Sequence, residues 1–184
     1  MTAFLLKSEY SMFGKLLVIM LVGFCFALSA VTASAQNNPY KISDSLYPDF
    51  VRVQNMKRNP QVLVLADSLY HEAEKIGDRK AQCALLCTPV QYAHNTKDTE
   101  MMDKAAQRCR EEALKYKFPQ YYYFAWKTQI ALYVNLKKLP KAMTLLSQME
   151  NDTRLYFNGY GKVECYMLYG NIYKLLQNED EAIR

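Results

Sequence analysis

Apolar side chains recur every three or four residues through most of the chain after position 60. Over residues 61–76 this spacing predicts a helix, and the pattern stops at Gly77. Glycine often closes a helix because it readily adopts the left-handed conformation. Asp78 and Asp98 each stand where a side chain can cap the first turn of a following helix. No segment sustains a period-two alternation of apolar and polar residues, so the pattern predicts an all-α fold.

The predicted helices are joined by short turns, so neighbouring helices should run antiparallel. They span residues 44–56, 61–76, 78–95, 98–116, 119–136, 139–151 and 161–176, and a last helix begins at Asn178. Pro89 lies inside the third helix, where we expect a kink or a late restart because proline cannot donate the helical hydrogen bond.

The first 35 residues follow a different pattern. Lys7 and Lys15 precede an apolar run over residues 16–31, and Ala33-Ser34-Ala35 follows. A positive head, a short apolar core and a small-x-small site predict a secretory signal peptide cleaved after Ala35, with an uncleaved anchor as the alternative and Met12 as an alternative start. The expected organisation is a signal peptide at 1–35, a lead-in with a short helix at 36–59, and helical repeats at 60–184.

Internal similarity points to a repeated unit. Tyr92, Tyr133 and Tyr173 recur at intervals of 41 and 40 residues. A bulky residue stands seven positions before each of these tyrosines, and these residues are Leu85, Trp126 and Tyr166. A fixed period that holds two helices is typical of a helical solenoid, in which each hairpin buries its apolar face against the next.

The last copy resembles a tetratricopeptide repeat. Tyr166, Tyr169, Gly170 and Tyr173, with Ala182 nine residues later, match the pattern of bulky, large, Gly, aromatic and Ala residues. The two earlier copies depart from this pattern. The middle copy has Trp126, Tyr133 and Ala142 at the matching positions, but Ile130 stands where the pattern has a small residue. The first copy has Leu85 and Tyr92, but Pro89 takes the place of the small residue and Met101 takes the place of the Ala.

This resemblance implies a right-handed solenoid of stacked hairpins in which the first helix of each hairpin lines a groove. It places His94 at the edge of that groove. The residues that it places within the groove are Phe124, Lys127, Val134, Asn135, Asn171 and Lys174. Because such a groove is mixed polar and apolar, we expect a protein or peptide partner, with a small ligand as the alternative.

A narrower resemblance concerns the arrangement of the whole chain. The string Asp-Ser-Leu-Tyr occurs at Asp44 in the lead-in and again at Asp67, ahead of the three repeat copies. This order resembles the periplasmic sensor region of Gram-negative two-component histidine kinases. This resemblance implies that the chain is the exported binding module of a signalling protein and lies in the periplasm. It also implies that the kinase residues are not in this chain and that a spanning helix beyond Arg184 tethers the module to the membrane. A free-standing periplasmic scaffold for envelope assembly is the alternative.

Composition and motifs favour binding over catalysis. The formal charge of +5 is spread along the chain rather than clustered, which argues against nucleic-acid binding. His71 and His94 have no partner at metal-ligand or catalytic-triad spacing. We therefore expect no enzyme activity in this chain, no metal and no cofactor, and no membrane span after the signal peptide.

The cysteines and the aromatic residues allow two interpretations each. Cys83 and Cys87 share a helical face and are either a metal or redox pair or small core residues, and we favour the core. Cys109 and Cys165 give no pairing from sequence. In the aromatic stretch over residues 121–126 we expect Tyr122 and Trp126 in the core, with a docking patch as the alternative.

The last residues predict an incomplete hairpin. Ala182 should pack against Gly170 from a helix that Arg184 cuts short, which would leave an apolar face uncovered. The residues of that face are Tyr169, Ile172, Tyr173 and Leu176. We expect residues 36–184 alone to form oligomers or to be poorly soluble, and one or two further hairpins to restore a monomer.

Overall fold

The described part of the chain is built from helices alone. A computed structural model describes residues 38–56 and 58–182, with side chains up to residue 176, and these residues contain no strand. The helices are α2 (Tyr47–Met56), α3 (Gln61–Ile76), α4 (Arg79–Thr96), α5 (Thr99–Lys115), α6 (Pro119–Asn135), α7 (Leu139–Leu155) and α8 (Lys162–Ala182), with a short 3-10 turn η1 (Phe157–Gly159) before α8. The all-α prediction is confirmed, whereas the signal peptide and Arg184 lie outside the described residues.

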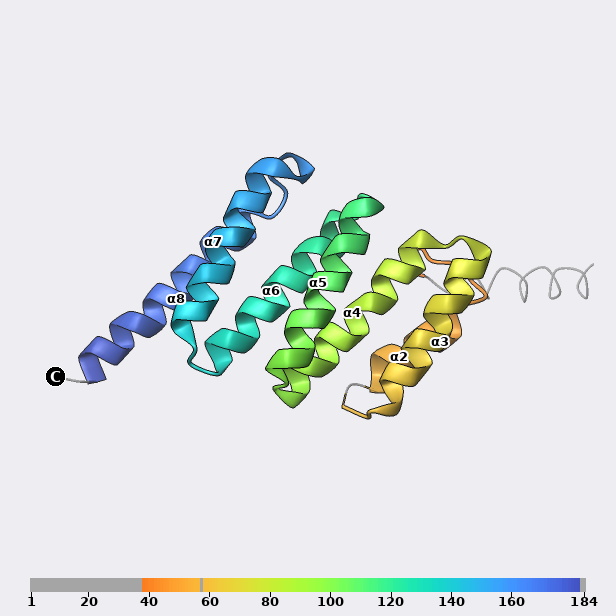
Figure 1. The fold of residues 1–184 in the computed structure, drawn as a ribbon, viewed down its shortest axis with the longest axis horizontal. Helices are drawn as coiled ribbons and strands as arrows, with labels where there is room; N and C mark the ends of the chain where they lie inside the picture. The colour runs from red at the N-terminus through yellow and green to blue at the C-terminus, as the bar shows by residue number, and fades with distance from the viewer. Residues whose placement is uncertain (1–37, 57, 183–184) are drawn as a thin grey trace, which may run out of the picture. The chain divides into compact units, whose positions relative to one another are not determined.

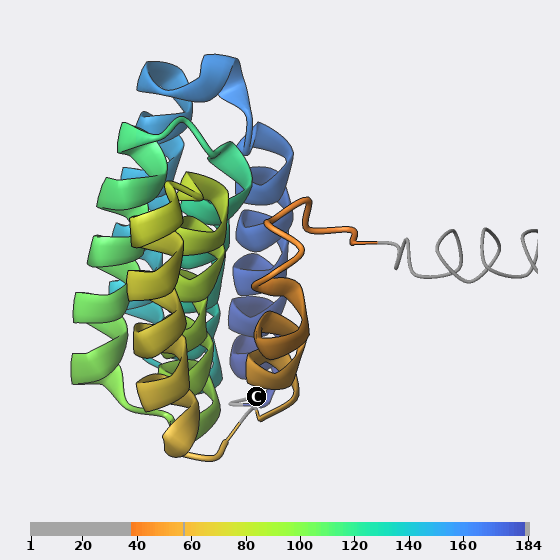
Figure 2. The same cartoon turned by 90° about the vertical axis from the view of Figure 1, so that its right-hand side faces the viewer.

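Consecutive helices pack against one another in chain order (Figure 1). The chain divides into residues 1–40 and 41–184, and all of these helices belong to the second unit. The even-numbered helices also contact each other, α2 with α4, α4 with α6, and α6 with α8. In the end view of Figure 2, α3 and α5 lie on one side and α8 lies on the other.

The helices α4 to α7 follow a regular spacing. They begin at Arg79, Thr99, Pro119 and Leu139, which are 20 residues apart. The turns also repeat at this interval, because Gly77, Lys97, Lys117 and Lys137 all have positive φ angles, between 56° and 75°. In each turn the next backbone N–H donates to a carbonyl five residues earlier, a bond that closes a helix. The 40-residue period therefore consists of two helix-turn units of equal length.

The predicted helix starts are confirmed at atomic detail. One carboxylate oxygen of Asp78 accepts from the Ala81 N–H at 2.8 Å, and Asp98 accepts from the Met101 N–H at 2.9 Å. Pro119 stands in the first turn of α6. A proline there costs no hydrogen bond, because the first N–H groups of a helix have no partner within it.

Asp78 also joins the start of the unit to α4. Its second carboxylate oxygen accepts from the Ser43 N–H at 2.6 Å. Burial alone would raise the pKa of this carboxyl, but the hydrogen bonds from the Ala81 and Ser43 N–H groups outweigh it and hold the pKa below its usual value. A carboxylate with a depressed pKa stabilises the fold above the unfolded-state pKa, and this contribution is lost as the pH falls.

We expect Asp78→Ala to lower the free energy of unfolding by about 1–2 kcal/mol at neutral pH, because both the cap and the link to Ser43 are lost. As the pH falls below about 4 the difference from wild type should shrink, because the carboxyl of the unfolded chain takes up its proton first and the native carboxylate, whose pKa is lower, follows only at a still lower pH. Urea titrations at several pH values measure this. The matched control Asp98→Ala removes only a cap and should cost less, so equal costs would refute a role for the Ser43 link.

Pro89 does not interrupt its helix. The structure has α4 continuous from Arg79 to Thr96, so the late restart that we predicted as one alternative is wrong. Pro89 is partly exposed, and the residues around it on α4 are mostly buried, so the packing of the helix holds it together despite the missing hydrogen bond.

The core is a series of three clusters, each made by three or four consecutive helices. The first cluster joins α2, α3 and α4 and contains Ile42, Leu46, Phe50, Val53, Val62, Ala66, Leu69, Ala73, Ala81, Ala84 and Leu85. The central cluster joins α4, α5 and α6 and contains Leu86, Val90, Ala93, Met102, Ala106, Cys109, Ala125 and Leu132. The last cluster joins α5 to α8 and contains Ala113, Tyr122, Tyr123, Trp126, Ile130, Tyr133, Ala142, Leu145, Leu146, Met149, Cys165 and Ile172.

The end of the chain differs from the prediction. We expected a break before Asn178, but α8 runs unbroken to Ala182 because no glycine or proline stops it. Ala182 lies on the same helix as Gly170 and cannot fold back against it, and a Cβ built on Gly170 meets no atom within 4 Å. The predicted end of α7 was also too early, since that helix continues to Leu155.

The uncovered face of α8 contains only two of the four residues that we predicted. Ile172 is buried and Tyr169 packs against the last cluster, because α7 covers that side of α8. Tyr173 and Leu176 are exposed, as predicted. Among the α8 residues whose side chains the structure describes, the large exposed apolar ones are Val163, Tyr166, Met167, Tyr173, Leu175 and Leu176.

Candidate functional site

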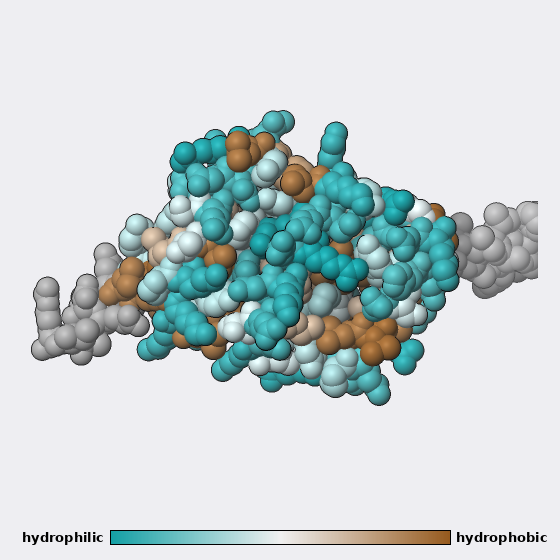
Figure 3. All heavy atoms as spheres, viewed as in Figure 1, coloured by the Kyte–Doolittle hydropathy of each residue, from teal (hydrophilic) through white to brown (hydrophobic). Residues whose placement is uncertain are grey.

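Two adjoining hollows lie along α4, one lined by α4 and α5 and the other lined by α3, α4 and α5. They measure about 510 and 410 Å³ and share Leu86, Pro89, Met101 and Arg108 as lining residues. We call them together the α3–α5 groove, and its other lining residues are Leu63, Val64, Ala66, Asp67, Tyr70, Leu85, Asp98, Glu100, Lys104 and Ala105. In the surface view of Figure 3, hydrophobic residues gather over the region of α3 and α4.

The floor of the α3–α5 groove is apolar. Leu85 and Leu86 are buried in the first and central clusters, and Met101 packs against the central cluster from α5. Small side chains at Ala66 on α3 and Ala105 on α5 fill little of the space between the helices. An apolar floor between helices can accept an apolar side chain of a ligand.

The rim of the α3–α5 groove carries both signs of charge. The Arg108 guanidinium lies over the Tyr70 ring, 5.2 Å from its centroid. Burial, with the Glu112 carboxylate adding to it, raises the pKa of the Tyr70 hydroxyl above its usual value, so this group stays neutral. An arginine stacked on an aromatic ring keeps the edge of its guanidinium available for a carboxylate. Lys104 is paired with Glu100 at 2.7 Å within α5.

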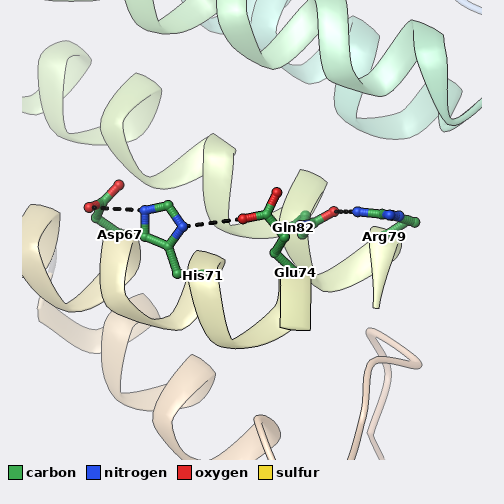
Figure 4. A network of polar contacts seen from close by, with 5 residues as sticks. All are labelled: Asp67, His71, Glu74, Arg79 and Gln82. Atoms are coloured by element: carbon green, nitrogen blue, oxygen red, sulfur yellow. Dashed lines mark hydrogen bonds and ion pairs between the residues drawn. The ribbon is translucent and has the colours of Figure 1, made fainter. Parts of the chain in front are cut away.

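Next to the groove, His71 stands between two carboxylates of its own helix (Figure 4). Its Nε2 lies 3.8 Å from Asp67 and its Nδ1 lies 3.3 Å from Glu74. All three side chains are more than half exposed, so the ion pairs add little stability. Among the described residues, no group of histidines, cysteines and carboxylates could hold a metal ion.

The predicted groove residues lie on α6 and α8. Lys127 is 3.7 Å from Glu164 of α8, and Asn135 is 3.3 Å from His94 of α4. Phe124 packs against the central cluster and Val134 against the last cluster. Asn171 and Lys174 are exposed on α8. The structure thus brings Lys127 and Asn135 into contacts between even-numbered helices. A ligand role for the six predicted groove residues stays a prediction.

The repeat-signature residues are packed in the middle copy and open in the last one. Trp126, Tyr133 and Ala142 are buried in the last cluster, and Tyr122 joins them there, so the core prediction for Tyr122 and Trp126 is confirmed. Leu85 is buried in the first cluster, and Tyr92 packs against it. In contrast, Tyr166, Gly170 and Tyr173 are exposed on α8.

A polar network between α5 and α6 was not predicted. The Asp103 carboxylate accepts from Gln129 at 2.6 Å and from the Tyr133 hydroxyl at 2.9 Å. Arg110 donates to Gln129 at 2.8 Å and lies over the Trp126 ring at 3.8 Å. Only the one-turn spacing of Trp126, Gln129 and Tyr133 on α6 hints at such a network in the sequence, because its partners come from other helices.

Comparison of the chain with models of protein families, with curated proteins and with solved structures finds no match. Over the residues that the structure describes, the helices are too short or too polar to cross a membrane.

Proposed function

We propose that the chain is a binding module built as a right-handed, tetratricopeptide-like helical solenoid, which takes a peptide segment of a partner protein in the α3–α5 groove. The observation that carries the binding site is the continuity of the groove: two hollows share four lining residues over an apolar floor. A continuous groove of this kind suits a peptide, which lays alternating side chains along it.

Two features support the solenoid. The equal helix-turn units of α4 to α7 produce the period that the sequence shows. The α6 residues Trp126 and Tyr133 are buried with contacts to both α5 and α7, whereas the residues 40 positions later on α8, Tyr166 and Tyr173, are exposed. This difference is expected if α6 and α8 are equivalent first helices of successive hairpins.

Arg108 suggests one feature of the peptide. Arg108 faces the groove from α5 and is held on Tyr70, whereas the neighbouring Lys104 is already paired with Glu100. An apolar anchor residue in the floor, followed by an acidic residue that reaches Arg108, would satisfy both parts of the site. We therefore propose an apolar-acidic peptide motif as the ligand.

The cellular role rests on the signal-peptide pattern and on the narrower resemblance. We propose an exported, periplasmic sensor region of a signalling protein, with a free-standing envelope scaffold as the second candidate. The coding sequence that follows codon 184 separates them, because a spanning segment and a kinase core would support the sensor and an immediate stop codon would support the scaffold.

A random-peptide display selection against the full chain tests the binding site. We expect the selected peptides to share an apolar-acidic motif and to bind about tenfold or more weakly to Arg108→Ala and to Val64→Lys. Both substitutions are at the exposed rim and should leave the fold intact, which circular dichroism would verify.

The matched control is Asn171→Ala with Lys174→Ala on α8, where the resemblance implies the groove. Binding that survives the rim variants and is lost in the α8 control would move the site to the α6–α8 surface. A selection that yields no peptide above background would refute peptide binding by this chain.

A further inference from the structure

Two cysteines from different helices face each other beside the α3–α5 groove. Cys87 of α4 and Cys109 of α5 are free thiols whose sulfur atoms are 3.8 Å apart. The Cys87 thiol also donates to the Cys83 carbonyl oxygen at 3.5 Å, and the Cys109 thiol donates to the Tyr121 carbonyl oxygen at 3.7 Å. Cys83 and Cys87 share the face that the sequence singled out, but the closest sulfur contact is with the other helix.

We propose that Cys87 and Cys109 form a modification site, a dithiol that a small-molecule disulfide oxidises to an α4–α5 cross-link. A disulfide needs its sulfur atoms about 2.05 Å apart. The two sulfur atoms are in contact at 3.8 Å, and each thiol also makes a weak hydrogen bond to a carbonyl oxygen, so rotation about the Cα–Cβ bonds is the movement that bond formation requires.

Accessibility sets the order of the steps. Cys87 is partly exposed, whereas Cys83 and Cys109 are buried. The Cys87 thiolate attacks the oxidant R–S–S–R, forms a mixed disulfide and releases one thiolate RS⁻. The Cys109 thiolate then attacks the Cys87 sulfur and releases the second RS⁻. The two cysteine protons leave with the released thiols, and the two electrons pass from the cysteines to the oxidant.

The raised pKa values of the thiols make the oxidation slow, and the limited access of solvent directs it to Cys87. The hydrogen bond with Cys109, together with burial, raises the pKa of the Cys87 thiol well above its usual value. Burial, with the nearby Cys109, raises the pKa of Cys83 to about 12. Few thiolates therefore exist at neutral pH, and attack depends on the thiol that solvent can reach.

The cross-link would act on the groove. Leu86 and Arg108, which line it, are the neighbours of Cys87 and Cys109 in the sequence. A bond between α4 and α5 closes the loop through residues 88–108 and removes conformational freedom from the unfolded chain. Oxidation would thus fix the two helices on which the shared lining residues of the groove stand.

Incubation of the full chain with oxidised glutathione, in a Cys25→Ser background, tests the proposal. Cys25 is the one cysteine outside the described residues, so four thiols remain. We expect two of them to disappear within hours, peptide mapping to find Cys87 linked to Cys109, and the midpoint of thermal unfolding to rise by about 5–10 °C. Dithiothreitol should reverse both changes.

The variants make the result specific. Cys165→Ala and Cys83→Ala should still lose two thiols, whereas Cys87→Ala, a change at a partly exposed position, should lose none to an intramolecular bond. Four thiols that persist in the folded protein, a bond that involves Cys83 or joins two chains, or a cross-linked form with a lower unfolding temperature would each overturn the proposal.

Discussion

Trp126→Ala is expected to lower the free energy of unfolding by about 3–5 kcal/mol, the usual cost of deleting a buried tryptophan ring. Trp126 is 5% exposed within the last cluster. Its indole N–H donates to Asp152 of α7 at 3.0 Å, and its ring face carries the Arg110 guanidinium of α5 at 3.8 Å. The substitution therefore opens a cavity and releases two contacts between helices, and urea denaturation followed by circular dichroism measures the loss.

The control is the residue that occupies the corresponding position 40 residues later. Tyr166 is 69% exposed on α8, so Tyr166→Ala should change the free energy of unfolding by no more than about 0.5 kcal/mol. Trp126→Phe keeps a ring but removes the donor to Asp152, and should cost about 1–2 kcal/mol. Equal costs for the two alanine variants would show that the Trp126 ring is not part of the core.

Gly161→Ala should destabilise the protein by about 2–5 kcal/mol, for two separate reasons. Gly161 has φ +96°, a conformation that is strained for any residue with a Cβ atom. A Cβ at this position would also lie 2.6 Å from the Tyr123 ring, which is 1% exposed and packed against Tyr160 and Phe157. The ring has no free space into which it can move, so overpacking adds to the backbone strain.

Two other glycines separate these contributions. Gly77 also has a positive φ but has nothing near its Cβ position, so Gly77→Ala should show only the backbone strain, about 1–2 kcal/mol. Gly170 lies within α8 in open space, and Gly170→Ala should stabilise the helix by up to about 1 kcal/mol. If Gly161→Ala costs no more than Gly77→Ala, the contact with Tyr123 is not as close as described.

Local signals predicted the helices well, because a cap or a turn is decided by a few neighbouring residues. Asp78, Asp98 and Pro119 start their helices as expected, and Gly77 ends one. The unbroken α8 was missed because Asn178 resembles a cap, and only the absence of a stopping residue before it argues against one.

The sites depend on contacts between helices, which sequence spacing does not reveal. The α3–α5 groove combines residues from three helices, and Cys87 meets a cysteine 22 positions away rather than the one a turn away. Asp103 and Asp152 gave no signal, since an isolated acidic residue on a helix is usually solvated. Here tyrosine, tryptophan and glutamine donors from α6 hold both.

The equal spacing of the helix starts from Arg79 to Leu139 limits how the gene can change in length. If forty codons were inserted or removed beginning at Arg79, the new junction would lie at the same position of a turn as the old one. Every later helix would then keep its direction and the side of the fold on which it lies. A change of twenty codons would join equally good turns but reverse every later helix, so that α5 would meet α3 in place of α4. Variation by whole hairpins is therefore the form of length change that this architecture can absorb, and internal duplication is a simple route by which it could have grown.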